Sequence, residues 1–139
     1  MLITRKTEYA IRALRSLADD GRRKVAVSQL SRELEIPRPY LRGILQTLRK
    51  KGLLYSYRGR GGGFKLARPA SEIRVVDLVR IFQGPVTFDR CVFKKRVCPD
   101  IQRCVLREEI KSMEREIAGR LSSITIESLS HEGRRERYA

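Results

Sequence analysis

The chain has 139 residues, of which 34% are charged, with a formal net charge of +15 and no Trp. This length allows one compact domain with a helical extension, but not two independent hydrophobic cores. No apolar run approaches the roughly 18 residues of a transmembrane helix, and the N-terminal residues lack the apolar core and cleavage site of a signal peptide. We therefore expect a soluble, cytoplasmic protein that does not bind membranes.

The positive charge is concentrated in the N-terminal half of the chain. Residues 1–70 carry 17 Lys and Arg against 5 Asp and Glu, whereas residues 71–139 carry 14 against 11. Two other interpretations are compatible with this charge. The basic side chains could simply be solvated, or they could bind an acidic membrane surface. Nucleic acid is the favoured partner, because neutralising its phosphates releases condensed counterions and drives binding.

Hydrophobic periodicity predicts three helices before the glycine-rich segment at residues 59–63. The first spans about residues 6–19. The second spans about residues 28–35, with Ser28 as a candidate N-cap, and it ends because Pro37 biases the preceding residue away from helical geometry. The third begins near Pro39, which a first helical turn tolerates, and runs to about Lys51.

The third predicted helix has an apolar stripe and, beside it, a polar and basic stripe. This second stripe has spacings of four, four and three residues and consists of Arg38, Arg42, Gln46 and Arg49. An ordinary solvated helix face would produce the same pattern. Its position after a short helix and a tight turn favours a recognition helix in the major groove of DNA.

A β-hairpin with a glycine-rich tip is predicted after the third helix. Residues 53–58 and 64–67 alternate in polarity around a tip that contains four Gly and Arg60. Glycines let the backbone approach a surface closely, and Arg58 and Arg60 would then reach phosphates or a narrow minor groove. A nucleotide-binding loop is excluded, since no Gly-Lys-Ser/Thr is present and a strand follows.

These segments together resemble the Rrf2 family of bacterial transcription regulators, which includes IscR, NsrR, RirA and the cluster-free CymR. The resemblance is carried by Tyr9-Ala10, Ile36-Pro37-Arg38-Pro39-Tyr40-Leu41, Leu48-Arg49-Lys50-Lys51-Gly52-Leu53 and Arg58-Gly59-Arg60-Gly61-Gly62-Gly63-Phe64. It implies a dimeric regulator that binds a palindromic promoter element, with Tyr40, Arg42 and Arg58 among the DNA contacts. IscR-like proteins have Glu where this chain has Arg42, so their operator preference does not transfer.

Two further helices are predicted in the C-terminal half. Residues 73–83 form a short buried helix that Gly84-Pro85 terminates. Residues near 104–123 form the longest helix, whose heptad-like apolar seam consists of Leu106, Ile110, Met113, Ile117, Leu121 and Ile124. This seam would pack either on its own domain or on a second copy of the chain. The family resemblance favours the dimer, whose two-fold axis would place two recognition helices about one DNA turn apart.

Three cysteines, Cys91, Cys98 and Cys104, lie close together before the longest helix. Their odd number argues against a disulfide framework, and their spacing matches no zinc ribbon or finger. Soft thiolates select iron–sulfur clusters, zinc or copper(I). Metal ligation is therefore favoured, with a thiol redox switch and inert thiols as alternatives.

The family resemblance implies that these three thiols hold an iron–sulfur cluster, with four iron atoms favoured over two. IscR-like proteins use a His three residues after the third Cys, but this chain has Arg107 there, which does not ligate. NsrR-like proteins use an acidic residue from the first helix of the partner, and this chain has Glu8 there. We expect Glu8 as the fourth ligand, against the alternative of a solvated carboxylate near neighbouring arginines.

The sequence thus predicts a mainly α fold with a small β-hairpin wing. Residues 1–85 form a winged helix-turn-helix domain, residues 86–104 a cluster-binding loop, residues 105–129 a dimerisation helix region and residues 130–139 a flexible tail. The expected function is a homodimeric repressor whose promoter binding is controlled by a cluster that senses iron, oxygen, nitric oxide or redox state. The alternative is a cluster-free regulator of the same fold, switched by thiols or zinc. Enzyme activity and a small-molecule substrate are not expected, because no base is paired with any Cys.

Overall fold

The computed structural model describes residues 3–21, 23–88 and 104–130. Its elements in chain order are α1 (Arg5–Asp19), α2 (Val27–Leu34), α3 (Arg38–Lys50), β1 (Leu54–Tyr57), β2 (Gly63–Leu66), the 3-10 turn η1 (Ala70–Glu72), α4 (Val75–Gln83), α5 (Val105–Ser122) and α6 (Ile126–Leu129). The predicted mainly helical fold with one antiparallel hairpin is confirmed. No helix among these described residues is both long and apolar enough to cross a membrane.

Local signals define the ends of the first helices. The Thr4 side chain accepts a hydrogen bond from the backbone of Thr7 and caps α1, which satisfies one of the unpaired amides of the first turn. The predicted N-cap at Ser28 is wrong. Helix α2 begins one residue earlier, at Val27, so Ala26 occupies the cap position and supplies no side-chain bond.

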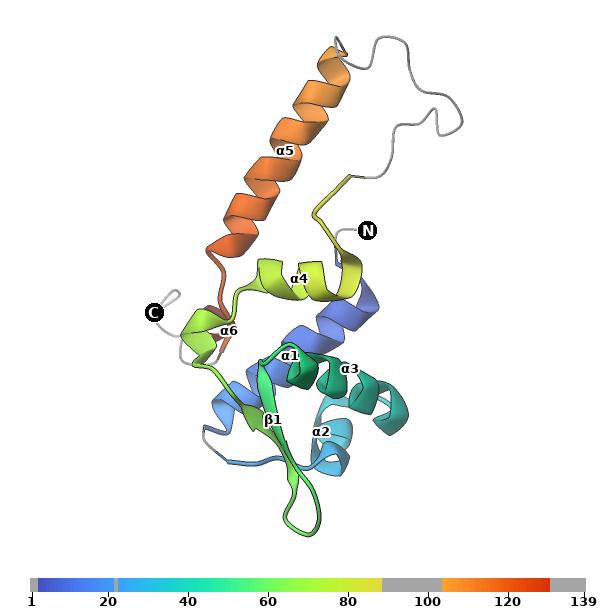
Figure 1. Cartoon of the computed structure of the whole chain (residues 1–139), viewed down its shortest axis with the longest axis vertical. Coiled ribbons are helices and arrows are strands. Elements are labelled where there is room, and N and C mark those ends of the chain that lie inside the picture. Colours follow the sequence, from blue (N-terminus) through green and yellow to red (C-terminus); the bar gives the residue numbers. More distant parts are fainter. Residues whose placement is uncertain (1–2, 22, 89–103, 131–139) are drawn as a thin grey trace.

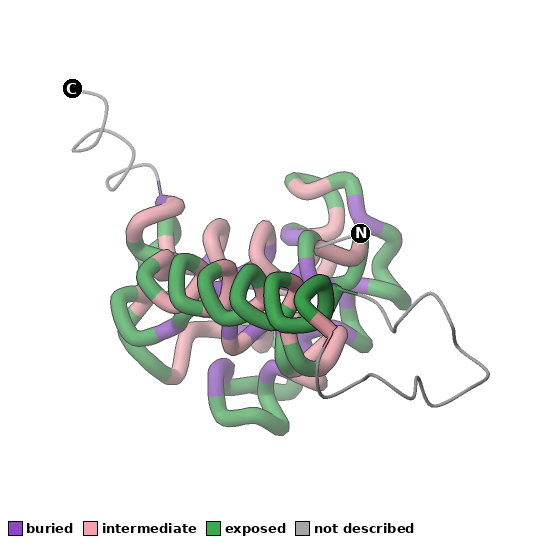
Figure 2. The backbone as a smooth tube through the Cα atoms, turned by 90° about the horizontal axis from the view of Figure 1, so that it is seen from above, coloured by how far each residue is buried: buried purple, intermediate pink, exposed green. Residues whose placement is uncertain are grey.

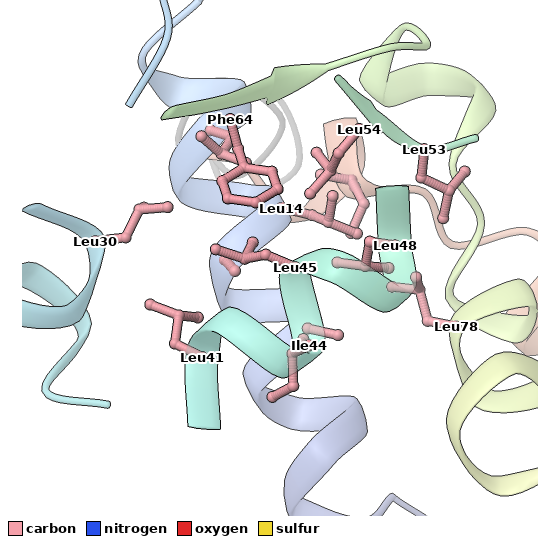
Figure 3. Packing of buried hydrophobic residues seen from close by; sticks show 14 of the residues in the cluster. Leu14, Leu30, Leu41, Ile44, Leu45, Leu48, Leu53, Leu54, Phe64 and Leu78 are labelled. Carbon is pink, nitrogen blue, oxygen red and sulfur yellow. The ribbon is translucent and has the colours of Figure 1, made fainter. Parts of the chain in front are cut away.

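The hydrophobic core lies between α1, α2, α3 and the wing. Helix α3 places Leu41, Leu45 and Leu48 in it, all completely buried. Figure 3 shows Leu45 beside Leu14 of α1, with Phe64 of the hairpin on the other side of Leu14 and Leu41 toward Leu30 of α2. The helix packs by its apolar stripe, and its polar stripe therefore remains outside.

The hairpin is fixed to the body by an isolated antiparallel bridge between Val25 and Phe64. Val25 and Phe64 exchange two backbone hydrogen bonds of 2.9 Å each. Within the hairpin, Leu54 is opposite Leu66 and Tyr57 is opposite Gly63. The segment between α1 and α2 thereby holds the wing against the core (Figure 1).

The chain after α5 returns to the domain, a feature that sequence periodicity missed. The amide of Val75 donates to the carbonyl of Ile124, and the amide of Ile126 donates to the carbonyl of Ile73. Ile126 in α6 is completely buried in the core formed with α1. Ile124, expected in the apolar seam of the long helix, therefore lies beyond the end of α5 in this returning segment.

Helix α5 projects from the body of the protein (Figure 1) and is exposed along most of its length (Figure 2). None of its residues is buried in the single chain, although Leu106 and Met113 are apolar and 67% and 47% exposed. Its packing within the chain is against α4. Because water is an unfavourable environment for so much apolar surface, this helix is suited to contact another protein surface.

Candidate nucleic-acid interface

A groove separates helix α3 from the wing. It has a volume of about 600 Å³ and is lined by Ala26, Val27, Ser28, Arg38, Arg42, Gln46, Arg49, Ser56, Tyr57, Arg58, Gly59, Gly62, Gly63 and Phe64. Four of these residues are arginines, and none of the described lining residues is acidic. Pockets for small ligands of this size are mostly apolar. The positive charge of this lining is instead suited to an extended anion such as a nucleic-acid backbone.

Helix α3 presents its polar stripe to this groove because its apolar residues are fixed in the core. Arg38 lies in the first turn, and Arg42 is exposed one turn later. Farther along, the Nε of Arg49 donates to Oε1 of Gln46 at 3.0 Å, which orients both side chains on the same face. The arrangement fits the entry of the helix N-terminus into a major groove, where Arg and Gln bind base edges.

The wing reaches the groove through a turn that requires glycine. A Cβ on Gly62 would collide with the carbonyl oxygen of Tyr57, and a Cβ on Gly63 with that of Val25. Gly63 also has a φ of 151°, a conformation that residues with a side chain rarely adopt. The tip is thus a tightly folded turn that carries Arg58 and Arg60 outward, both exposed.

An aromatic contact connects α1 to the start of α3. The rings of Tyr9 and Tyr40 meet edge to face, with centroids 5.6 Å apart. The guanidinium of Arg12 lies 5.8 Å from the Tyr9 ring centroid and donates to the carbonyl of Leu34 at 2.6 Å. Through the hydrogen bond of Arg12 and the ring contact of Tyr9, α1 contacts both the end of α2 and the first turn of α3.

Of the three cysteines, only Cys104 lies within the described residues. It is half-buried, is not in a disulfide and occupies the N-cap position of α5. Cys91 and Cys98 lie outside the described residues, so no statement follows on how the three thiols are arranged. The predicted position of Cys104 at a helix start is confirmed.

The predicted fourth ligand, Glu8, lies in the first turn of α1 and is exposed. Within the part of the chain that is described, its carboxylate takes part in none of the ion pairs. The neighbouring Thr7 is completely buried, and its hydroxyl donates to Oε1 of Gln83 at 2.7 Å. The first turn of α1 therefore lies against the end of α4, directly before the segment that carries the cysteines.

The structure brings together most of the residues predicted from sequence to bind DNA. Five of them line one groove: Arg38, Arg42, Gln46, Arg49 and Arg58. Tyr40 and Arg60 lie outside its lining, Tyr40 at the contact with Tyr9 and Arg60 at the wing tip. Sequence analysis missed the contribution of α2 and of Tyr57 to the groove. The alternation along residues 53–58 was the available signal for Tyr57, whereas nothing local indicated the role of Ser28.

Comparison with known proteins agrees with this geometry. Residues 3–132 match the sequence model of the Rrf2 family, described as an iron-dependent transcriptional regulator. The transcriptional regulator IscR of Photorhabdus laumondii is 33% identical over 130 residues, which cover 93% of this chain and 79% of that protein.

Solved structures similar to this chain include members of the same group of regulators. IscR of T. potens has a TM-score of 0.74 at 27% identity, covering 100% of this chain and 93% of the other. The oxidized form of Staphylococcus aureus CymR has a TM-score of 0.76 at 25% identity, covering 94% and 97%. The chain therefore belongs to the Rrf2 family and is a DNA-binding transcription regulator with a winged helix-turn-helix fold.

Proposed function

We propose that the protein is a homodimeric repressor that binds promoter DNA through the groove between α3 and the wing, under the control of an iron–sulfur cluster. The observation that carries the DNA-binding part is the groove itself, with its four arginines and no acidic residue among those described. In this mode Arg42 and Gln46 contact base edges, while Arg58 and Arg60 contact the backbone.

The apolar side of α5 supports the dimer. Leu106 and Met113 are exposed in the single chain, and Ile110, Ile117 and Leu121 on the same helix are only partly buried. A two-fold pairing of α5 would remove this surface from water, at about 25 cal/mol per Å² of apolar area. It would also present two copies of α3 to a palindromic DNA site.

The donor set fits an iron–sulfur cluster. Three thiols supply soft ligands, and Cys104 is accessible and free of any disulfide. Glu8 of the partner subunit is an exposed carboxylate without a competing ion pair among the described residues. We assign Cys91, Cys98, Cys104 and Glu8 as the ligands, with a four-iron cluster favoured.

The chain offers a physical connection between Glu8 and the DNA-binding groove. Glu8 lies one residue before Tyr9, which packs edge to face on Tyr40 at the beginning of α3. A bound cluster supplies a redox-sensitive set of Fe–S bonds. Holding or releasing Glu8 would shift the first turn of α1, and the contact of Tyr9 with Tyr40 would carry this change to α3. Such a device has two states with different ligand contacts, as allosteric control requires.

A thiol-switched regulator is the second candidate. It is favoured by the fold similarity to the oxidized form of Staphylococcus aureus CymR, whose TM-score of 0.76 is close to that of T. potens IscR at 0.74. The two candidates share the DNA-binding groove. They differ in whether the cysteines bind iron and sulfide.

Anaerobic purification followed by a visible absorption spectrum and assays of iron and acid-labile sulfide separates the two candidates. We expect a brown protein with broad absorption, matched iron and sulfide, and loss of both in Cys98→Ala. Glu8→Ala should make the absorption bleach faster in air, whereas the exposed control Glu72→Ala should not. A colourless protein after anaerobic reconstitution would refute the cluster and leave the thiol switch.

A further inference from the structure

The outer face of the wing carries a second cationic surface, separate from the groove beside α3. Side chains alternate across a strand, so Leu54 enters the core at 2% exposure while Tyr55 and Tyr57 are 53% and 39% exposed. Lys65 is the register partner of Tyr55 on β2. Lys24 joins this face because the next residue, Val25, is bonded to β2.

The lysines of this face are held over the tyrosine rings. The ammonium of Lys24 lies 4.7 Å from the centroid of Tyr57, and that of Lys65 lies 5.5 Å from the same ring. Lys65 also lies 5.9 Å from the Tyr55 centroid. A cation over an aromatic ring is attracted by the negative face of that ring, so each of these arrangements restrains an otherwise flexible side chain. Two positive charges are thereby gathered around one exposed ring.

This face has no anionic partner in the described part of the chain. The open cleft beside Tyr57 is lined by Arg23, Lys24, Tyr57, Gly61 and Lys65, with no carboxylate among these described residues. None of the ion pairs among the described residues includes Lys24 or Lys65. Like charges held together repel each other, so an external anion would relieve this repulsion.

We propose that the outer wing face binds the phosphate backbone of the DNA that flanks the segment contacted by α3. Tyr57 lines both the outer cleft and the groove beside α3, so the two cationic surfaces meet at the wing. A duplex seated in the groove carries a phosphate about every 3.4 Å along each strand, and its backbone continues past the wing tip. This continuity favours DNA over an acidic protein as the occupant. The inference rests on the proposed DNA-binding function and adds Lys24 and Lys65 to the residues that bind phosphate.

The double variant Lys24→Gln/Lys65→Gln tests this proposal. Binding to a mixed-sequence duplex is measured over a range of salt concentrations. The slope of log K against log salt should become shallower by about 0.9 for each phosphate that is no longer neutralised, or about 1.8 per protomer. The matched control Lys111→Gln/Arg115→Gln removes the same charge from exposed positions on α5 and should retain the wild-type slope. Lys24→Arg/Lys65→Arg should also retain it.

The length of the flanking DNA supplies a second measurement. On a site enriched from random sequence, the wild-type affinity should rise when flanking base pairs are added beyond the bound segment, and the double variant should not show this rise. An unchanged salt slope together with an unchanged rise from the flanks would overturn the outer-face proposal while leaving the groove as the DNA site. Failure of the wild-type protein to bind any duplex would overturn the proposed function as well.

Discussion

Replacing Gly63 by Ala tests how the wing is joined to the body of the protein. The added Cβ would collide with the carbonyl oxygen of Val25 and lie 2.9 Å from the amide nitrogen of Ala26. These are backbone atoms, so no side-chain rotation relieves the collision. The φ of 151° at this position also strains any residue that carries a Cβ.

The expected decrease in the free energy of unfolding follows from the backbone hydrogen bonds that the substitution breaks. To escape the collision, the segment around Val25 must move away from β2, which breaks its two 2.9 Å hydrogen bonds with Phe64. At about 0.5–1.5 kcal/mol per bond and about 1–3 kcal/mol for the backbone strain, Gly63→Ala should lower the free energy of unfolding by about 2–6 kcal/mol. That is a large share of the roughly 5–15 kcal/mol by which domains are stable.

Urea unfolding followed by circular dichroism measures this decrease in stability. Protein concentrations must be equal, because the stability of the proposed dimer would depend on concentration. Gly119→Ala is the control, since this exposed glycine lies within α5 and its Cβ would meet nothing within 4 Å. The control should be more stable than the wild type by about 0.5–1 kcal/mol. If Gly63→Ala unfolds within about 0.5 kcal/mol of the wild type, the argument for a wing fixed by this close approach is refuted.

Four further substitutions address the interface, the dimer and the core. Arg60→Ala should weaken binding to all duplexes and make the salt dependence shallower by about 0.9 for each phosphate released; an unchanged slope in a titration would remove the wing tip from the interface. Arg42→Ala should change the order of preference among enriched sites more than the affinity for random DNA, and a uniform decrease in competition assays would make it a phosphate contact. Met113→Glu should convert a dimer to a monomer in sedimentation equilibrium, because it places a charge on the apolar side of α5; a dimer that persists would assign that surface another partner. Leu78→Ala, in a completely buried position, should lower the free energy of unfolding by about 2–5 kcal/mol in urea, and a change near zero would show that α4 is dispensable for the core.

The sequence alone predicted helices α1 to α5, the hairpin and the polar stripe of α3 that we propose binds DNA. Each depends on local information: apolar residues at helical spacing, a proline or glycine at an element's end, and alternation around a glycine-rich tip. Once the apolar stripe of α3 is assigned to the core, Arg38, Arg42 and Arg49 must lie on its exposed side. The groove observed beside α3 contains all three of these side chains.

Tertiary structure alone decided which distant segments meet. The prediction of Ser28 as an N-cap failed because a good capping residue at one position does not prevent the helix from starting earlier when core packing favours it. The assignment of Ile124 to the long helix failed because the backbone bond of Ile124 with Val75 competes with continued helix. The outer wing face likewise needs Lys24 and Lys65, 41 residues apart in sequence, to be brought together by the bonds between Val25 and Phe64. Such contacts depend on the free energy of the whole packed domain, which the periodicity of a single segment does not contain.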